Sequence, residues 1–273
     1  MNKFLSNILL VGFSSLTINT LAQDFEVSPV GFDFNTMPGG IQTKKIWITN
    51  HSNSRSVFQI KIQDVIYDEE GCERIRPRGT TEHSAAKWLS VEPYTVEVDP
   101  NSQGVATLSM SVPSDGYDTR WCQIIVSEFH ERSAFEADNN MGAGVNVTPE
   151  IVAWVTQTPK GFKENKVSIT NFTEIEESED QENRTFVVTI ENLGKSIISG
   201  QLYIQAANMS SSLEEYKILA QNAKIYTGSI RKFKFKLNPG TLPSGEYDFS
   251  CILDMGRDTP LRGAHLKSTV TIE

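Results

Sequence analysis

The segment KFKFKL, residues 232–237, alternates charged and apolar side chains without interruption. Because successive side chains of a β-strand point to opposite faces, this pattern places Phe and Leu on one face and Lys on the other. Segments 185–191 and 265–273 alternate in a similar way. Such segments are typical of antiparallel strands that have one buried face and one solvated face. The chain is therefore predicted to be all-β.

Segments of this kind recur along both halves of the chain and are separated by turns rich in Pro, Gly, Asn and Asp. The predicted strands of the first half are residues 25–34, 43–50, 57–65, 89–98, 105–112, 120–129 and 145–156. Those of the second half are residues 166–171, 185–192, 199–205, 216–225, 229–237, 246–254 and 265–273. Seven short strands per half are typical of an immunoglobulin-like sandwich. We therefore predict two tandem immunoglobulin-like antiparallel β-sandwiches, residues 23–159 and 160–273, with the boundary where Pro159 and Gly161 end a strand.

The two halves also repeat a local sequence order. Residues 113–122 read PSDGYDTRWC and residues 243–251 read PSGEYDFSC, so each has Pro-Ser, a Gly, Tyr-Asp and then a Cys. An early strand of each half ends in Ile-x-Asn, at Asn50 and at Asn192. These repeats predict one sandwich plan used twice. Tyr117 and Tyr247 are then expected to play matching roles, each with a packed ring and a hydroxyl bonded to nearby backbone.

The N-terminus has the order of a secretory signal peptide. Met1-Asn2-Lys3 is a short basic start, residues 4–18 are mostly apolar, and Thr20-Leu21-Ala22 supplies small residues at the cleavage position. We predict a signal peptide at residues 1–22 and export to the periplasm or to the cell surface. The apolar stretch is too short for a bilayer, and no later one approaches the ~20 residues that a transmembrane helix needs. No membrane-spanning segment is therefore expected.

Charge and cysteine content narrow the possible partners. The formal net charge of −9 repels the phosphates of nucleic acids, so no nucleic-acid partner is expected. Export makes disulfides chemically possible, and the odd count of three cysteines leaves at least one thiol free. Cys72 and Cys122 form a possible disulfide, and the alternative is that Cys122 is a small buried apolar residue. Cys251 is predicted to be a buried thiol in the core.

The sequence carries no recognisable catalytic or cofactor-binding motif. The four histidines are scattered and have no second ligand at metal-binding spacing, so no metal site is predicted. There is no nucleophile elbow, phosphate-binding glycine loop or dinucleotide fingerprint. We therefore expect a protein that is not an enzyme and has no cofactor. The four tryptophans lie within or next to predicted strands and are expected to be core residues, the alternative being an exposed stripe that binds carbohydrate.

The first half resembles the N-terminal domain of PapD-like periplasmic pilus-assembly chaperones. The similar features are the sequences WITN at residues 47–50, VEP at 91–93 and TRWCQ at 119–123, and a last strand that ends in Pro159 before a second sandwich. In that family an Arg of the first strand and a Lys of the last strand bind the carboxylate of the client. Here residues 25–34 have no Arg, and residues 145–158 have neither Lys nor Arg. The domain order is also similar to that of WxL-interacting surface proteins.

The resemblance implies an envelope protein that binds another envelope or surface protein and assists its assembly. An edge strand offers unpaired backbone N–H and C=O groups to a strand of another chain. The candidate partner-binding edge is the last strand of the first sandwich, with Val145, Val147, Ile151 and Ala153. The alternative function is a structural or adhesion module that binds cell-wall glycan or a surface partner.

Overall fold

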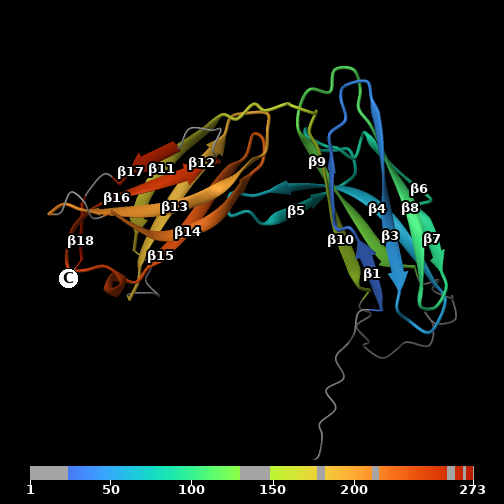
Figure 1. Cartoon of the computed structure of the whole chain (residues 1–273), viewed down its shortest axis with the longest axis horizontal. Coiled ribbons are helices and arrows are strands. Elements are labelled where there is room, and N and C mark those ends of the chain that lie inside the picture. The colour runs from blue at the N-terminus through green and yellow to red at the C-terminus, as the bar shows by residue number, and fades with distance from the viewer. Residues whose placement is uncertain are drawn as a thin grey trace, which may run out of the picture.

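A computed structural model of the chain describes residues 24–129, 148–176, 182–210, 215–256, 262–266 and 269–272. The described residues form two β-sandwiches that lie at an angle to each other, so that the molecule is bent and has a concave side between them (Figure 1). The predicted signal peptide at residues 1–22 lies outside the described residues. The predicted fold class, two tandem immunoglobulin-like β-sandwiches, is confirmed.

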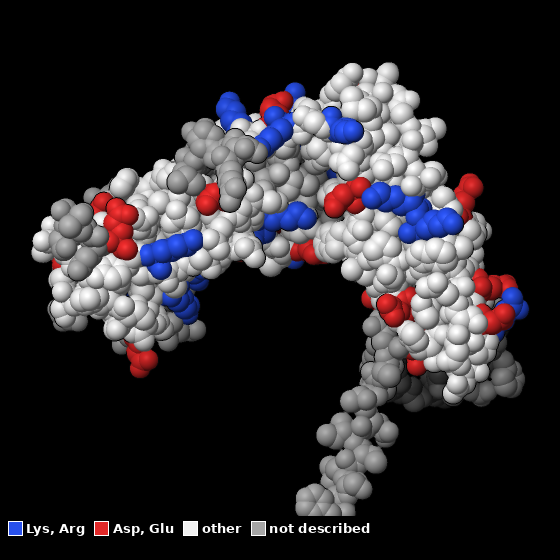
Figure 2. All heavy atoms as spheres, viewed as in Figure 1, with Lys and Arg blue, Asp and Glu red and all other residues white. Residues whose placement is uncertain are grey.

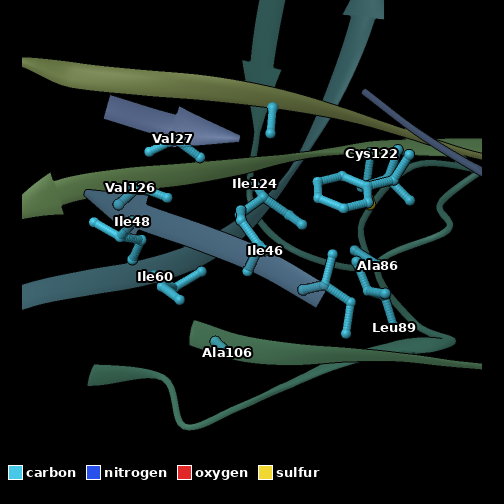
Figure 3. Close-up of a cluster of buried hydrophobic side chains, with 14 of the residues drawn as sticks. Val27, Ile46, Ile48, Ile60, Ala86, Leu89, Ala106, Cys122, Ile124 and Val126 are labelled. Carbon is cyan, nitrogen blue, oxygen red and sulfur yellow. The ribbon is translucent and has the colours of Figure 1, made fainter. Parts of the chain in front are cut away.

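The first sandwich packs two sheets against each other. Sheet 1 has the order β1 (Phe25–Ser28), β3 (Ile41–Asn50), β8 (Ser102–Ser111) and β6 (Leu89–Glu92). Sheet 2 has the order β2 (Gly31–Phe34), β10 (Glu150–Gln157), β9 (Arg120–Glu128), β4 (Ser56–Tyr67) and β5 (Glu73–Arg76), and β7 (Thr95–Val98) also pairs with β4. Apolar side chains of both sheets point toward one another between the layers (Figure 3). All pairs are antiparallel except β2 with β10, which run parallel.

The second sandwich follows the linker 158–166. Its three-stranded sheet 3 has the order β11 (Val167–Ile175), β12 (Arg184–Asn192) and β15 (Ile230–Leu237). Sheet 4 has the order β14 (Glu215–Ile225), β13 (Ile198–Asn208), β16 (Gly245–Asp254) and β17 (Arg262–His265), and β18 (Val270–Ile272) also pairs with β16. A short 3-10 helix, η1 (Pro239–Thr241), precedes β16. In β15 the residues Phe233, Phe235 and Leu237 are buried and the intervening lysines are exposed, as the alternation predicts.

Two strands that the sequence predicts as single are each divided between the two sheets. Residues 25–34 form β1 in sheet 1 and β2 in sheet 2, and residues 89–98 form β6 in sheet 1 and β7 in sheet 2. Pro29 and Pro93 stand at the two divisions. In both segments the buried positions change from odd to even numbers at the proline. The chain crosses from one layer to the other at that point, so the inward-facing parity must change.

The Ile-x-Asn repeat gives the two sandwiches an equivalent buried amide. Asn50 and Asn192 are both fully buried at the ends of β3 and β12. Each side-chain oxygen accepts a hydrogen bond from the N–H two residues later, at Ser52 (2.9 Å) and at Gly194 (3.0 Å). Each amide nitrogen donates to the carbonyl four residues later and to the carbonyl of a neighbouring strand end, Val98 (3.1 Å) or Ile225 (3.0 Å). This part of the shared plan is confirmed.

The predicted equivalence of Tyr117 and Tyr247 is wrong. Tyr247 is fully buried and its hydroxyl donates to the Pro243 carbonyl at 2.9 Å, but Tyr117 is 59% exposed. The two tyrosines differ in local structure. Tyr247 lies inside β16, four positions before the buried Cys251, whereas Tyr117 lies in the loop before β9, which begins at Arg120. Because side chains alternate along a strand, Tyr247 shares the inward face of β16 with Cys251, and this alternation does not extend to the loop position of Tyr117.

Candidate partner-binding edge and the interdomain junction

The predicted partner-binding strand is β10, which begins at Glu150 in the structure. One side of β10 pairs with β9 along its whole length. The other side pairs with β2, but only from Trp154 to Gln157. Residues 150–153 therefore have no strand partner on that side among the described residues. Residues 150–153 lack this strand partner because the N-terminal segment is divided at Pro29. Its first part, β1, pairs with β3 in the other sheet, and only its second part, β2, pairs with β10.

Alternation decides which backbone groups face the open side. The N–H of Trp154 donates to the Val30 carbonyl (2.9 Å) and the N–H of Thr158 donates to the Phe34 carbonyl (3.0 Å), so even-numbered residues direct their backbone groups away from β9. By the same alternation, Glu150 and Val152 direct their N–H and C=O groups to the uncovered side. They are the groups that a partner strand would meet.

The four residues predicted for this edge have different positions. Val145 and Val147 lie outside the described residues. Ile151 and Ala153 are in β10, where Ala153 is fully buried and Ile151 packs against the core of the first sandwich. Their odd parity directs their backbone groups to β9, so they support the strand from the inner face. That a partner pairs with this edge stays a prediction.

Immediately beside the open segment, β10 enters an aromatic cluster that joins the two sandwiches. The Trp154 ring lies 6.4 Å from the ring of Tyr67 on β4, and Tyr67 stacks at 4.2 Å on Tyr226 of the second sandwich. Trp121 lies 4.7 Å from Tyr226, and its indole N–H donates to the Val65 carbonyl at 2.9 Å. Burial raises the pKa of Tyr67, so its hydroxyl stays neutral, and this hydroxyl accepts a hydrogen bond from the Tyr226 hydroxyl at 3.2 Å.

Next to this cluster is a cavity of about 480 Å³ between the sandwiches. Its wall includes Trp121, Tyr226 and His83, and the His83 ring stacks on Trp121 at 5.3 Å. The His83 Nδ1 atom lies 3.7 Å from the carboxylate of Asp118, and that carboxylate accepts a hydrogen bond from Arg120 at 3.0 Å. Burial acts to raise the pKa of Asp118, but His83 and Arg120 together hold it below the ordinary value. Among the described residues, no group of three or more His, Cys, Asp or Glu could hold a metal ion.

The four tryptophans are not all core residues, contrary to the expectation. Trp121 is buried at the junction, Trp88 and Trp154 are half-buried, and Trp47 is 36% exposed on the outer face of sheet 1. Trp121 and Trp154 lie on the outer face of sheet 2, which the second sandwich partly covers. The signal for this was present in β9, RWCQIIVSE, which is buried on both faces instead of alternating.

The possible disulfide between Cys72 and Cys122 is not formed. Both thiols are free, Cys122 is fully buried in the core of the first sandwich, and Cys72 is exposed between β4 and β5. The two side chains thus occupy opposite environments. The alternative, that Cys122 is a small buried apolar residue, is confirmed, and Cys251 is buried in the second core as predicted.

Thiol labelling of the native protein is expected to modify Cys72 alone. Burial raises the pKa of Cys122 and raises that of Cys251 to about 11, so little of either is the reactive thiolate at neutral pH. A chromogenic disulfide reagent should therefore detect one thiol per folded chain and three after unfolding in guanidinium. Detection of a single thiol in the unfolded, unreduced chain would contradict the free state of these cysteines.

Within the described ranges, no helix has the length and the apolar character needed to cross a bilayer.

Comparisons with known proteins find similarity in the fold. No protein-family model matches the chain, and no curated protein matches it. Among solved structures, a chain of the chaperone–tip adhesin complex of CFA/I fimbriae biogenesis is similar, with a TM-score of 0.51 and 12% identity over 90% of this chain and 99% of that chain. The class 5 fimbriae chaperone CfaA is similar to the same extent, with a TM-score of 0.51 and 14% identity over 89% of this chain and 99% of that chain.

This likeness shows that the chain has a PapD-like two-sandwich fold. It covers both sandwiches, and at this level of identity it concerns the fold alone. The similarity in domain order to WxL-interacting proteins receives no support from these comparisons.

Proposed function

We propose that the protein is a non-enzymatic, chaperone-like component of the bacterial cell envelope that binds another envelope protein by sheet-edge pairing. The observation that carries this proposal is the uncovered segment of β10, residues 150–153, in a strand whose other side is fully paired. A strand of the partner would complete sheet 2 at this position and satisfy the backbone groups of Glu150 and Val152.

The character of the segment supports this use. Natural edges are usually protected by charged residues, prolines or bulges. Here β10 pairs with β9 in an unbroken register, and Ile151, Val152 and Ala153 are all apolar. The segment lies on the side of the first sandwich that faces the bend, so a partner seated there also approaches the second sandwich (Figure 1).

The fold comparison and the N-terminal sequence agree with this role. The similar solved structures include a fimbrial chaperone and a chain of a chaperone complex with a tip adhesin. We propose, by analogy with that fold, that the partner of this chain is also a protein that is assembled outside the cytoplasm. The signal-like residues 1–22 support a periplasmic location.

The decisive substitution is Val152→Pro. It removes an N–H that faces the open side and leaves the β9 ladder intact, so the chain should fold and lose its partner. We expect partner affinity to fall by about tenfold or more, because one hydrogen bond is lost and the proline ring obstructs the approaching strand. The partner is first captured from the native envelope with the wild-type chain, identified by mass spectrometry and then titrated against each variant.

Two further variants make the result specific. Val152→Ala shortens the side chain but keeps the N–H, so it should retain most of the affinity. Ile151→Pro removes a donor to β9 and should destabilise the first sandwich itself. If folded Val152→Pro binds the captured protein as wild type does, or if the chain sediments with peptidoglycan and captures no protein, the proposal fails.

A further inference from the structure

The hairpin of β4 and β5 reaches out of the first sandwich toward the second (Figure 1). Its turn is fixed by Asp68, whose carbonyl accepts from the N–H of Gly71 (2.9 Å) and whose carboxylate accepts from the N–H of Cys72 (2.7 Å). The Asp68 N–H in turn donates to the Cys72 carbonyl at 3.1 Å. The hairpin therefore presents a defined surface to the turn between β14 and β15.

Backbone and side chain both join the hairpin to the second sandwich at Lys232. Its N–H donates to the Glu69 carbonyl at 2.6 Å, and its ammonium lies 2.5 Å from the Glu69 carboxylate. Figure 2 shows charged side chains of both signs close together at the junction of the two sandwiches. Six residues before Lys232, the stack of Tyr226 on Tyr67 adds apolar burial, since Tyr226 is only 5% exposed.

Gly71 allows the hairpin and the second sandwich to approach each other closely. Its φ is +85°, and a Cβ added there would lie 1.6 Å from Nη1 and 2.0 Å from Cζ of Arg231. The guanidinium thus lies against the bare backbone of Gly71, and it also lies 5.3 Å from the centre of the Phe233 ring. Any side chain at position 71 must displace Arg231 from the junction.

We infer that the β4–β5 hairpin is a clamp that holds the two sandwiches in one fixed orientation. The linker 158–166 alone would let them move independently, which is the usual behaviour of domains with small polar interfaces. The clamp adds a buried aromatic stack, a backbone hydrogen bond and an ion pair between segments about 160 residues apart in sequence. Its role is independent of what β10 binds.

Removal of the clamp is tested with Tyr67→Ala and Gly71→Val in the full chain. Both positions lie outside the two main core clusters, so each sandwich keeps its own core. Gly39→Val is the matched control, because Gly39 has a similar φ of +78° and its added Cβ meets nothing within 4 Å. The same backbone strain is thus introduced away from the second sandwich.

Two measurements report the orientation. One is the rate of trypsin cleavage at Lys160 and Lys163 in the linker, and the other is the maximum dimension from small-angle X-ray scattering. We expect both clamp variants to be cleaved about tenfold faster, since proteolysis follows the population of the open form, and to broaden the scattering profile. Gly39→Val should match wild type in both.

Circular dichroism establishes that each variant is folded before the comparison. If folded Tyr67→Ala keeps the wild-type cleavage rate and scattering profile, the clamp is overturned. If Tyr67→Ala opens the linker and Gly71→Val does not, Arg231 has no part in the clamp and that element of the inference is wrong.

Discussion

Tyr247→Ala is expected to lower the free energy of unfolding by about 3–5 kcal/mol, because it leaves a cavity in the second core. The Tyr247 ring is fully buried and lies 6.3 Å from Phe249 and 6.4 Å from Tyr216. Tyr117→Ala is the matched substitution in the first sandwich. Since Tyr117 is 59% exposed, its loss should change stability by less than about 0.5 kcal/mol.

Tyr247→Phe separates the hydroxyl from the ring. It leaves the Pro243 carbonyl without its donor and should cost about 1–3 kcal/mol. Urea denaturation of the full chain, followed by fluorescence and circular dichroism, measures all three variants. Equal losses for Tyr117→Ala and Tyr247→Ala would show that the two tyrosines are equivalent after all and that the exposure of Tyr117 is wrong.

The contrast between these tyrosines shows how far the sequence determines the fold. Alternation predicted the strands of both sandwiches because it records burial directly, as in β15. The same rule does not reach Tyr117, because this residue lies in the loop before β9, where side chains need not alternate. Alternation would have divided the strands at Pro29 and Pro93, where the inward-facing parity changes.

The contacts at the junction of the two sandwiches could not be predicted from the sequence, for a different reason. Tyr67 and Tyr226 are 159 residues apart, and their contact depends on how two completed sandwiches meet. Residues of β5 are all exposed, so the strand has no burial pattern that would reveal it. The φ of Gly71 could be suspected in a turn, but its contact with Arg231 could not.

The candidate edge was predicted as a strand but not as an edge of limited length. Alternation indicated β10 and the resemblance indicated its position. Neither revealed that β2 pairs in parallel with Trp154–Gln157 and leaves only the segment before it open. Within that segment the outward N–H groups belong to Glu150 and Val152 and not to Ile151, because adjacent residues direct their N–H groups to opposite sides.

Asn192→Ala is expected to destabilise the second sandwich by about 3 kcal/mol. The substitution removes one hydrogen bond from each of three backbone groups, the carbonyls of Ser196 and Ile225 and the N–H of Gly194, each bond worth roughly 1 kcal/mol or more because it is buried. Asn50→Ala should have a smaller effect on the first sandwich, because the same positions are bonded there but the bonds to Ser52 and Ser54 are only part-buried, so water can replace them. An exposed amide, Asn222, is the control, and its change to Ala should be nearly neutral.

Asn192→Asp tests whether the donor side of the amide matters. An ionised carboxylate at this fully buried position would face two carbonyl oxygens, so folding favours the protonated acid and raises its pKa above that of the unfolded chain. A carboxyl group whose pKa is higher in the folded chain contributes fully to folding stability below its unfolded pKa of about 3.9. This stability is lost as the pH rises through the folded pKa. Relative to wild type, the Asp variant should therefore lose stability between about pH 4 and pH 7, whereas the penalty of Asn192→Ala stays constant.

Urea midpoints of the three proteins at pH 4.5 and pH 7 measure the difference. A pH-independent gap between Asp and wild type would mean that the side chain turns out to solvent and that the two carbonyls do not depend on the amide.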